Sequence, residues 1–347
     1  MSNYISETTK AIGSMDFSAL EDSCIMITGA TGLVGSAIIK SILEYNKTTD
    51  KKITVVALVR NREKAERVFA DYISESLKFK VSDVCELEAE NMGVDYIIHA
   101  ASQTSSKAFV NQPVETINTA IKGTTNILEF AKANNVKSLV YLSSMEVYGT
   151  PLTDEKIYEN HGTSLDTMAV RSCYPESKRM CENICTSYFS EYGVPVKTVR
   201  LTQTFGPGVE YNDGRVFAEF ARCAIEKRNI TLKTKGETKR NYLYLFDAVS
   251  AILTVLTKGE NGNAYNAANE GTYCSIYEMA NMVAEKCAGG EISVVIEENE
   301  DISKFGYAPT LKMNLSTEKI RSLGWTPQID LSDMFNIMIE DMKTDRH

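Results

Sequence analysis

The chain has 347 residues, of which 43% are hydrophobic and 24% are charged, a composition typical of folded globular proteins that excludes disordered, collagen-like and small disulfide-stapled chains. The formal net charge of −9 argues against nucleic acid and anionic membranes as the main partners, because surplus carboxylates repel phosphate-rich surfaces. A chain of this length is expected to form about two structural units whose cores need neither metal nor disulfide support.

The N-terminus and the cysteines indicate the compartment. The first ten residues lack a basic segment followed by an apolar run, so we expect no secretory signal, and no segment approaches the roughly 18 apolar residues of a membrane span. The eight cysteines are scattered without Cys-x2-Cys pairs, and only three histidines accompany them. This pattern predicts reduced thiols, a cytoplasmic protein and no metal site.

Apolar strands and amphipathic helices alternate along the first 150 residues. Short β-branched or apolar runs predict strands at 24–28, 53–59, 96–100 and 138–143. Apolar residues at helical spacing between them predict helices at 33–43, 63–77 and 114–134. Strands that alternate with helices require crossover connections, so this order predicts an α/β fold with a doubly wound, mostly parallel sheet of the Rossmann type, covered on both faces.

The order of elements changes beyond residue 150. We expect a loop at 154–166, a helix at 174–192, a strand at 196–201, and then helices at 216–227, 247–257, 276–287 and 330–342. Short strands and Gly- and Pro-containing segments separate these helices. The pattern predicts a smaller mixed lobe that rests on the C-terminal edge of the sheet.

A glycine-rich turn with the spacing Gly-x-x-Gly-x-x-Gly joins the first strand to the first helix. Backbone without side chains can approach a pyrophosphate closely and place it at the N-terminus of the helix. A tight strand-to-helix connection is the alternative explanation of the glycines, but the strand-helix-strand order around them favours a bound dinucleotide, NAD(P). The residues expected to contact it are Gly29, Thr31, Gly32, Leu33, Val34 and Gly35.

The second strand ends in Arg60, Asn61 and Arg62, at the place where dinucleotide folds distinguish NAD from NADP. An acidic residue at this position accepts hydrogen bonds from the adenine ribose of NAD, whereas an arginine pairs with the 2′-phosphate of NADP. No acid stands here, so these residues favour NADP, with NAD as the alternative. A solvated basic loop without a ligand would show the same residues.

Tyr174 and Lys178 lie four residues apart, which places both side chains on one face of the helix expected at 174–192. A free tyrosine ionises near pH ~10, so a tyrosine that acts as a base at neutral pH needs positive charge nearby, which Lys178 and an oxidised nicotinamide would supply. Such pairs are common on surface helices. Ser144 supports a catalytic role, because it ends the fourth strand at the edge where open α/β sheets bind ligands.

Together these motifs resemble those of the extended short-chain dehydrogenase/reductases that act on nucleotide-sugars, the NAD(P)-dependent epimerase/dehydratase family. The resemblance implies an enzyme with an N-terminal extension at 1–23, a mainly NAD(P)-binding domain at 24–200 and a mainly substrate-binding lobe at 201–347, with some interleaving. It spans nearly the whole chain and rests on Thr28 to Gly35, Asp83, His99 to Ser102, Asn118 with Gly123-Thr124, Ser144 to Gly149, Tyr174 with Lys178, Arg200 to Pro207, Arg240 to Asp247 and Leu323 to Pro327.

The resemblance also implies roles for individual residues. Ser144 would hydrogen-bond the sugar C4 hydroxyl, Tyr174 would remove its proton, and Lys178 would hold the ribose and tune the phenol. The cofactor would further contact Asp83, Val84, Ala100, Ala101, Ser102 and Asn118, the last within an interior polar network. A nucleotide-diphosphate sugar would lie across the second lobe, near Met145, Gln203, Asn212, Asp213, Arg215 and Arg240. Surface salt bridges are the alternative role of the two arginines.

The two residues after Ser144 indicate which reaction follows the oxidation at C4. In the family's 4,6-dehydratases an acid and then a glutamate base stand here, whereas 4-epimerases usually carry small or neutral residues. Met145 cannot donate a proton, but Glu146 resembles the glutamate of the dehydratases and of the UDP-glucuronate decarboxylases. We therefore expect Ser144, Glu146, Tyr174 and Lys178 to be catalytic, in an enzyme that dehydrates or decarboxylates the oxidised sugar and keeps its NAD(P) bound through an internal redox cycle.

Other functions stay open from the sequence. A 4-epimerase would share the oxidation at C4, and an NADPH-dependent 4-keto sugar reductase would fit Arg60 but leave Glu146 without a role. A sensor or scaffold that binds the dinucleotide without chemistry is the non-enzymatic alternative, which the intact catalytic residues disfavour. The resemblance also implies a homodimer joined by the helices at 118–134 and 174–192, although the packed helices of a monomer would show the same mixed polarity.

Overall fold

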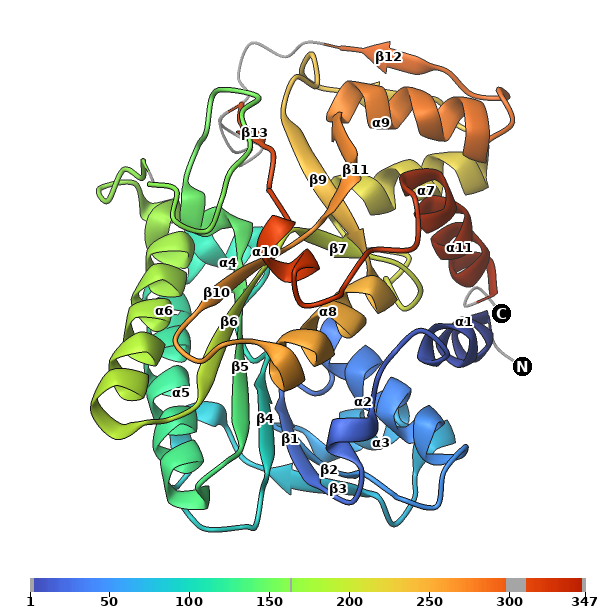
Figure 1. Cartoon of the computed structure of the whole chain (residues 1–347). Coiled ribbons are helices and arrows are strands. Elements are labelled where there is room, and N and C mark those ends of the chain that lie inside the picture. The colour runs from blue at the N-terminus through green and yellow to red at the C-terminus, as the bar shows by residue number, and fades with distance from the viewer. Residues whose placement is uncertain (1–2, 163, 298–309, 345–347) are drawn as a thin grey trace.

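The computed structural model of the chain describes residues 3–162, 164–297 and 310–344. Its centre is a seven-stranded sheet in which neighbouring strands run parallel, in the order β10-β6-β5-β4-β1-β2-β3 (Figure 1). The strand order reverses between β1 and β4, which confirms the predicted doubly wound Rossmann-type sheet. The strands are β1 (Cys24–Thr28), β2 (Thr54–Val59), β3 (Leu77–Val81), β4 (Tyr96–His99), β5 (Ser138–Ser144), β6 (Val196–Leu201) and β10 (Ala264–Ala267).

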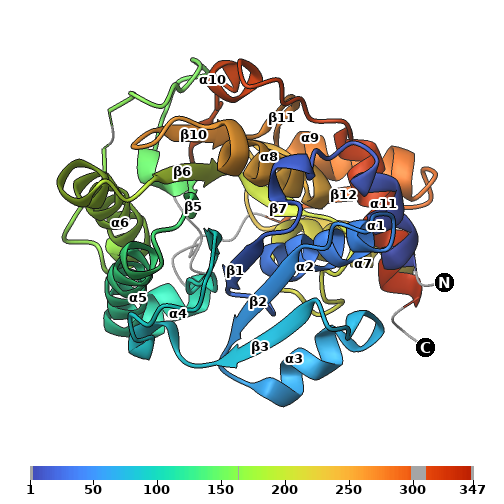
Figure 2. The ribbon, with the colours of Figure 1, turned by 60° about the horizontal axis from the view of Figure 1, so that its bottom comes forward.

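Helices cover both faces of this sheet (Figure 2). One layer contains α2 (Leu33–Asn46), α3 (Arg62–Val68) and α8 (Leu245–Lys258), and the other contains α5 (Pro113–Asn134) and α6 (Cys173–Tyr192), with the short α4 (Ser106–Asn111) before α5. Because successive residues of a strand point to opposite faces, Ile25 and Ile27 of β1 pack into the first core, while Met26 packs into the second. Burial on both faces explains why these strands are continuous apolar runs in the sequence.

One predicted element differs from the structure. The helix expected at 63–77 ends at Val68 as α3, and Leu77 begins the edge strand β3. In β3, apolar residues at positions 77, 79 and 81 alternate with two lysines, which is the two-residue period of a strand with one solvated face. The expectation of a long helix is therefore wrong beyond residue 68. The two lysines interrupt the apolar residues of this short edge strand, so the sequence shows no continuous apolar run there.

The smaller mixed lobe begins beside the carboxyl end of β6, at the top of Figure 1. It contains one sheet with the order β11-β9-β13, in which β7 also pairs with β9, and a two-stranded sheet of β12 and β8. A π-helical turn at Val283–Cys287 continues α9. The elements are β7 (Gln203–Phe205), α7 (Val216–Glu226), β8 (Ile230–Leu232), β9 (Lys239–Tyr244), β11 (Asn269–Ser275), α9 (Ile276–Met282), β12 (Val294–Ile296), β13 (Lys312–Met313), α10 (Glu318–Arg321) and α11 (Leu331–Thr344).

The two lobes interleave along the chain. After leaving the central sheet at residue 201, the chain returns to it through α8 and through β10, which pairs with β6. Helix α1 (Asn3–Ile12) belongs to the N-terminal extension and packs beside α11, so the first and last described helices are neighbours (Figures 1 and 2). The division of the chain near residues 23 and 200 stays a prediction.

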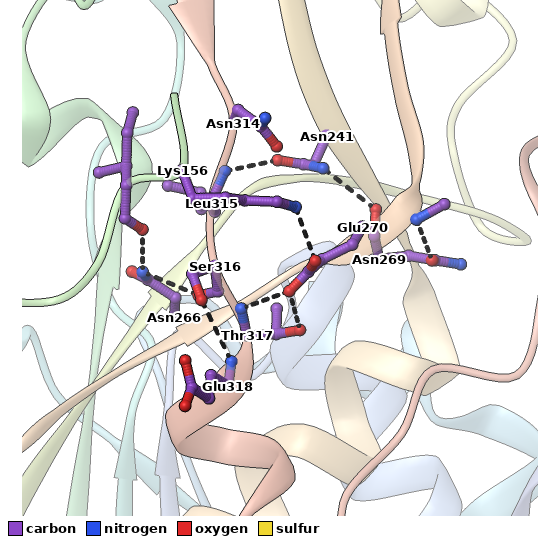
Figure 3. A network of polar contacts seen from close by, with 12 residues as sticks. Lys156, Asn241, Asn266, Asn269, Glu270, Asn314, Leu315, Ser316, Thr317 and Glu318 are labelled. Carbon is purple, nitrogen blue, oxygen red and sulfur yellow. Dashed lines mark hydrogen bonds and ion pairs between the residues drawn. The ribbon is translucent and has the colours of Figure 1, made fainter. Parts of the chain in front are cut away.

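A buried polar network fastens the lobe to the central sheet (Figure 3). The side-chain amide of Asn266 on β10 donates to the backbone carbonyls of Ile157 (3.0 Å) and Ser316 (3.1 Å), and its oxygen accepts a hydrogen bond from the Tyr148 hydroxyl (2.7 Å). Glu270 accepts hydrogen bonds from both the backbone and the hydroxyl of the residue after Ser316 (2.8 Å each). Since buried polar groups are costly without partners, this network fixes three distant segments relative to one another.

The described residues contain no helix long and apolar enough to cross a membrane. Within the same ranges, no three His, Cys, Asp or Glu side chains come together as a metal site requires. All eight cysteines lie in described segments and are free thiols.

Candidate active site

The glycine-rich turn between β1 and α2 forms a cradle of open backbone. Gly29 has a φ of +62°, and a Cβ atom there would lie 2.7 Å from the carbonyl group of Ala100, so only glycine fits. A Cβ at Gly35 would lie 2.3 Å from the carbonyl oxygen of Gly29. Gly32 at the N-cap gives no side-chain hydrogen bond to α2, so the free N–H groups of the first turn suit a pyrophosphate. This turn also contains Thr31, Leu33 and Val34.

The segment after β4 lies directly against this cradle. Ala100 is the residue nearest to Gly29, and the backbone N–H of Ala101 donates a hydrogen bond to the Thr28 hydroxyl at the end of β1 (2.9 Å). Ser102 follows, and its hydroxyl donates to a neighbouring carbonyl (3.3 Å). The structure thus brings Ala100 and Ala101 to the point where the strand order reverses, which is where sheets of this type bind ligands.

An interior polar chain lies beside the cradle, but Asn118 is not part of it. The ring of His99 connects the hydroxyls of Thr28 (2.7 Å) and Thr124 (3.2 Å), and burial lowers the pKa of His99 to about 3, so the ring is neutral. Asn118 is exposed on α5, which corrects the expectation of an interior position. It precedes the buried Gly123 by five residues, which is about 140° around the helix at ~100° per residue.

The tips of β2 and β3 carry the residues expected to distinguish NAD from NADP. The Arg60 side chain is 81% exposed, and its guanidinium lies 4.0 Å from the Asp83 carboxylate. Asn61 caps α3 through its side-chain oxygen (2.8 Å), Arg62 pairs with a glutamate on the same helix (2.9 Å), and Val84 is buried against α5. Arg60 and Asp83 therefore offer side chains to a ligand, whereas Asn61, Arg62 and Val84 serve the local fold.

Tyr174 and Lys178 are buried side by side at the start of α6, with 8% and 4% of their surfaces exposed. The Lys178 ammonium donates to the carbonyl of Leu142 on β5 (2.7 Å) and lies 5.9 Å from the centre of the Tyr174 ring. Burial lowers the pKa of Lys178 to about 8. Burial, and then the charge of Glu146, raises the pKa of the Tyr174 phenol, whereas a hydrogen bond with Ser144 lowers it. The structure thus brings the predicted Ser144, Tyr174 and Lys178 together.

Ser144 ends β5 and is followed by a 3₁₀ turn, Met145–Tyr148 (the catalytic turn). Its hydroxyl accepts a hydrogen bond from the backbone N–H of Glu146 (3.2 Å). Met145 is only 7% exposed, lies in an apolar cluster, and accepts a hydrogen bond on sulfur from Thr202 (3.3 Å). Met145 therefore packs in the core, and its contact with the substrate stays a prediction.

Glu146 forms an ion pair that the sequence analysis missed. Its partner is Arg171, whose Nη1 lies 2.9 Å from Oε2 and whose Nη2 lies 3.3 Å from Oε1. The guanidinium carbon of Arg171 lies 5.7 Å from the centre of the Phe109 ring, and this ring stacks on Tyr174 at 4.3 Å with an angle of 12°. The sequence signal that could have identified Arg171 is its position three residues before Tyr174, close to one helical turn. No sequence signal pointed to Phe109 on α4.

A second, more deeply buried ion pair supports the catalytic turn. Arg200 on β6 pairs with Glu182 on α6 (2.6 Å), and the two side chains are 13% and 14% exposed. Ser143 donates a hydrogen bond to Glu182 (2.5 Å), and Arg200 donates one to the Tyr148 hydroxyl (2.8 Å). Because Tyr148 also bonds Asn266, the catalytic turn is held between the sheet and the network that fastens the lobe.

The predicted substrate residues of the lobe fall into two groups. Arg240 on β9 donates to the side chain of Gln203 on β7 (3.1 Å), and among the described residues its buried Nε finds no hydrogen-bond partner, which is costly unless a ligand provides an acceptor. Arg215 instead forms an ion pair with Asp213 (2.6 Å), and Asn212 is exposed on the same loop. The structure brings Arg240 and Gln203 together, whereas Arg215 already has an acidic partner.

A cavity of about 810 Å³ opens beside another part of α6 and is lined in part by Glu176, Arg179, Asn183 and Asn263. Of the described residues that line it, none belongs to the predicted catalytic group. The cavity therefore borders the catalytic turn, through Val147 and Tyr148, and not the Ser-Tyr-Lys residues themselves.

Comparisons with known proteins agree with this architecture. Residues 25–268 match the model of the NAD-dependent epimerase/dehydratase family. UDP-glucuronic acid decarboxylase 5 of Arabidopsis thaliana is 27% identical over 322 residues, which cover 92% of this chain and 89% of that protein. UDP-glucuronic acid decarboxylase 1 of Xenopus tropicalis is 29% identical over 317 residues, which cover 90% of this chain and 70% of that protein.

Solved structures show the same fold at lower sequence identity. UDP-glucose 4-epimerase from Thermotoga maritima has a TM-score of 0.77 at 20% identity, over 93% of this chain and 100% of that chain. A dTDP-glucose 4,6-dehydratase from Streptomyces venezuelae with NAD bound has a TM-score of 0.74 at 21% identity, over 93% and 98%. Since the family model covers the phosphate cradle and the Ser-Tyr-Lys group alike, the chain belongs to the NAD-dependent epimerase/dehydratase family and is an enzyme of that family.

Proposed function

We propose that this enzyme oxidises the C4 hydroxyl of a nucleotide-diphosphate sugar, removes a C6 carboxylate as carbon dioxide, and returns the hydride to C4. The observation that carries the proposal is the buried Tyr174 phenol, hydrogen-bonded with Ser144 and placed beside Lys178 and Glu146. The two relatives described above are UDP-glucuronic acid decarboxylases, which points to UDP-glucuronate as the first substrate to test.

Tyr174 removes the proton from the C4 hydroxyl, which Ser144 orients by a hydrogen bond. Burial opposes ionisation of the phenol, so the phenolate depends on positive charge nearby. Lys178, with a pKa of about 8, is mostly protonated at neutral pH and supplies that charge. The cradle of Gly29 to Gly35 would hold the pyrophosphate of NAD(P), which would supply the acceptor for the C4 hydride.

The second step distinguishes decarboxylation from dehydration. After oxidation at C4, a C6 carboxylate belongs to a β-keto acid. The C5–C6 bond breaks to release carbon dioxide, its electron pair forms the C4–C5 enolate, and C5 then takes up a proton from water, so no acid is needed to protonate a leaving hydroxyl. Met145, at the position where the family's dehydratases carry that acid, is apolar and buried. Arg240 presents its buried Nε, unpaired among the described residues, to an anionic part of the substrate. Dehydration is the second candidate, since Glu146 stands where those enzymes carry their base.

The cofactor is NAD(P), and we propose that NADP binds more tightly than NAD. The exposed Arg60 guanidinium at the tip of β2 can pair with a 2′-phosphate, and none of the three residues directly after β2 is acidic. Titration of the protein with each coenzyme measures the two dissociation constants. Tighter binding of NAD contradicts this part of the proposal.

We further propose a cytoplasmic homodimer joined through α5 and α6. These two helices expose apolar side chains, including Val114, Ile117, Met180 and Phe189, and the free thiols suit a reducing compartment. Sedimentation should give a dimer mass for the wild type and a monomer mass for Met180→Asp. A monomeric wild type contradicts the assembly.

Product masses test the proposed reaction. The wild type and Tyr174→Phe are incubated with UDP-glucuronate, UDP-glucose, dTDP-glucose and GDP-mannose in the presence of NAD or NADP. Loss of carbon dioxide from UDP-glucuronate by the wild type alone supports the proposal, whereas loss of water from a hexose supports the dehydratase candidate. An unchanged mass with inverted C4 indicates an epimerase, and no reaction with any of these sugars contradicts the proposal.

A further inference from the structure

The Arg171 guanidinium donates two parallel hydrogen bonds to the Glu146 carboxylate, of 2.9 Å and 3.3 Å. This fork geometry is available to arginine but not to lysine. The side chains are 30% and 28% exposed, so solvent screens the pair less than it screens an ion pair on the open surface. The two residues come from short 3₁₀ turns that are 25 positions apart in the sequence, so only the folded chain brings them together.

The pair is also fixed with respect to Tyr174. Phe109 contacts the Arg171 guanidinium and stacks on the Tyr174 ring, and Arg171 lies in the turn Val170–Ser172, directly before α6. A planar guanidinium against an aromatic ring keeps its orientation better than a free side chain does. Arg171 is therefore placed to act on both Glu146 and Tyr174.

Four elements bring ionisable groups to the Tyr174 phenol. The catalytic turn contributes Glu146, the turn before α6 contributes Arg171, α6 contributes Lys178, and β5 contributes the neutral phenol of Tyr141. Beyond burial, which has the largest effect, Glu146 raises the pKa of Tyr174 and Arg171 lowers it. If Arg171 were absent, an unbalanced carboxylate would remain beside the group that must become an anion.

We propose that Arg171 is a positioning residue of the reaction, which holds Glu146 in place and balances its charge beside the Tyr174 phenol. The inference rests on the function proposed above. Because the pair has no net charge, it also allows an anionic sugar to approach Glu146. Arg171 need not touch the substrate or the coenzyme to have these effects.

The pH dependence of C4 oxidation tests the proposal. The appearance of reduced nicotinamide is followed in single turnovers with UDP-glucuronate between about pH 6 and pH 10 for the wild type, Arg171→Gln, Glu146→Gln and the double variant. An opposite charge within about 4 to 6 Å of a group shifts its pKa by about 1 unit or more. In the profile of oxidation rate against pH, we expect Arg171→Gln to shift the acidic limb to higher pH by about one unit. The double variant should return this limb close to the wild-type position.

Matched variants separate this effect from a merely structural one. Arg171→Lys keeps the positive charge but loses the two parallel hydrogen bonds, so we expect a slower reaction whose acidic limb lies at the same pH as in the wild type. Arg179→Gln removes an arginine of α6 that pairs with Glu176 (3.3 Å), with side chains 42% and 33% exposed, and should leave the acidic limb of the pH profile unchanged. The proposal is overturned if Arg171→Gln keeps the wild-type limb, or if the double variant is displaced as far as Arg171→Gln.

Unfolding in urea provides a test that needs no substrate. If the pair exists in solution, the double variant loses less in its unfolding midpoint than the sum of the losses in Arg171→Gln and Glu146→Gln. Additive losses overturn the proposal even if no sugar reacts. A wild type that oxidises none of the sugars, together with non-additive losses, would instead count against the proposed function alone.

Discussion

The Rossmann half and the smaller lobe hold their functional residues in different ways. Gly29, Tyr174 and Lys178 lie on single strand-helix units, and their positions follow from local geometry: a positive φ, a buried helix face and a spacing of four residues. Arg240 and Gln203 come from neighbouring strands of the lobe that are 37 residues apart in sequence. The catalytic residues therefore lie on rigid local units, whereas substrate recognition depends on distant segments that only the whole fold brings together.

The largest loss of activity is expected when the phenol oxygen is removed. Tyr174→Phe should slow C4 oxidation by about 10²-fold to 10⁴-fold, while the ring keeps its stacking on Phe109 and coenzyme binding persists. Single-turnover absorbance measures the rate. Tyr188→Phe is the matched control, since its hydroxyl lies on the same helix but bonds Glu129 (2.6 Å). An unchanged rate in Tyr174→Phe would remove the catalytic assignment of the Rossmann half.

Lys178→Met should abolish activity and raise stability at neutral pH. Burial lowers the pKa of Lys178 to about 8 from an ordinary value of 10.5, so the unfolded state holds the proton more tightly, and the wild type bears a penalty of about 3 kcal/mol below pH ~8. As the pH rises from about 8 to 10.5, the lysine deprotonates in both states and the penalty disappears.

The free energy of unfolding in urea at about pH 7 and pH 9.5 checks this expectation. The stability advantage of Lys178→Met should shrink at the higher pH, and an advantage that grows would contradict the assignment. Lys343→Met, which removes an exposed lysine paired with Glu340, should change stability little at either pH.

Within the lobe, Arg240 and Arg215 are expected to differ in their contribution to substrate binding. Arg240→Gln removes a buried donor that lacks a partner among the described residues, and should weaken substrate binding by about 10-fold to 100-fold, the range for hydrogen bonds to charged groups. Arg215→Gln removes a residue already paired with Asp213 and should weaken it by no more than about 3-fold. KM values and equilibrium titrations with the nucleotide sugar measure both. Equal losses would show that the ion pair of Arg215 opens to bind substrate.

A further effect, on the coenzyme alone, is expected at the tip of β2. Arg60→Ala should weaken NADP binding by about 10-fold and leave NAD binding nearly unchanged, because the exposed guanidinium interacts only with the additional phosphate. Fluorescence titration with the two coenzymes checks this ratio. A parallel loss for both would indicate that Arg60 supports the local fold.

Sequence patterns predicted most of the central sheet because its strands are apolar on both faces and stand out as continuous runs. Strand β3 was missed because its alternating lysines lack that signal. The spacing of Tyr174 and Lys178 revealed the catalytic helix face directly.

Two features of the site could not be derived from local spacing. Met145 stands within a polar motif, yet it packs with apolar residues supplied by the lobe. The pair of Arg171 with Glu146 joins two turns whose approach depends on the packing of α6 against β5 and the catalytic turn. Long-range packing determines both the burial of Met145 and the pairing of Arg171 with Glu146, and no periodic pattern in the sequence indicates either of them.

The most direct test of the central claim, an internal oxidation and reduction at C4 supported by Tyr174, uses UDP-glucuronate that carries deuterium at C4. We predict that the enzyme, with only the coenzyme it binds, releases carbon dioxide over many turnovers and forms a product that retains the deuterium at C4. A product that has lost the label, or deuterated coenzyme that accumulates in solution, would contradict the claim.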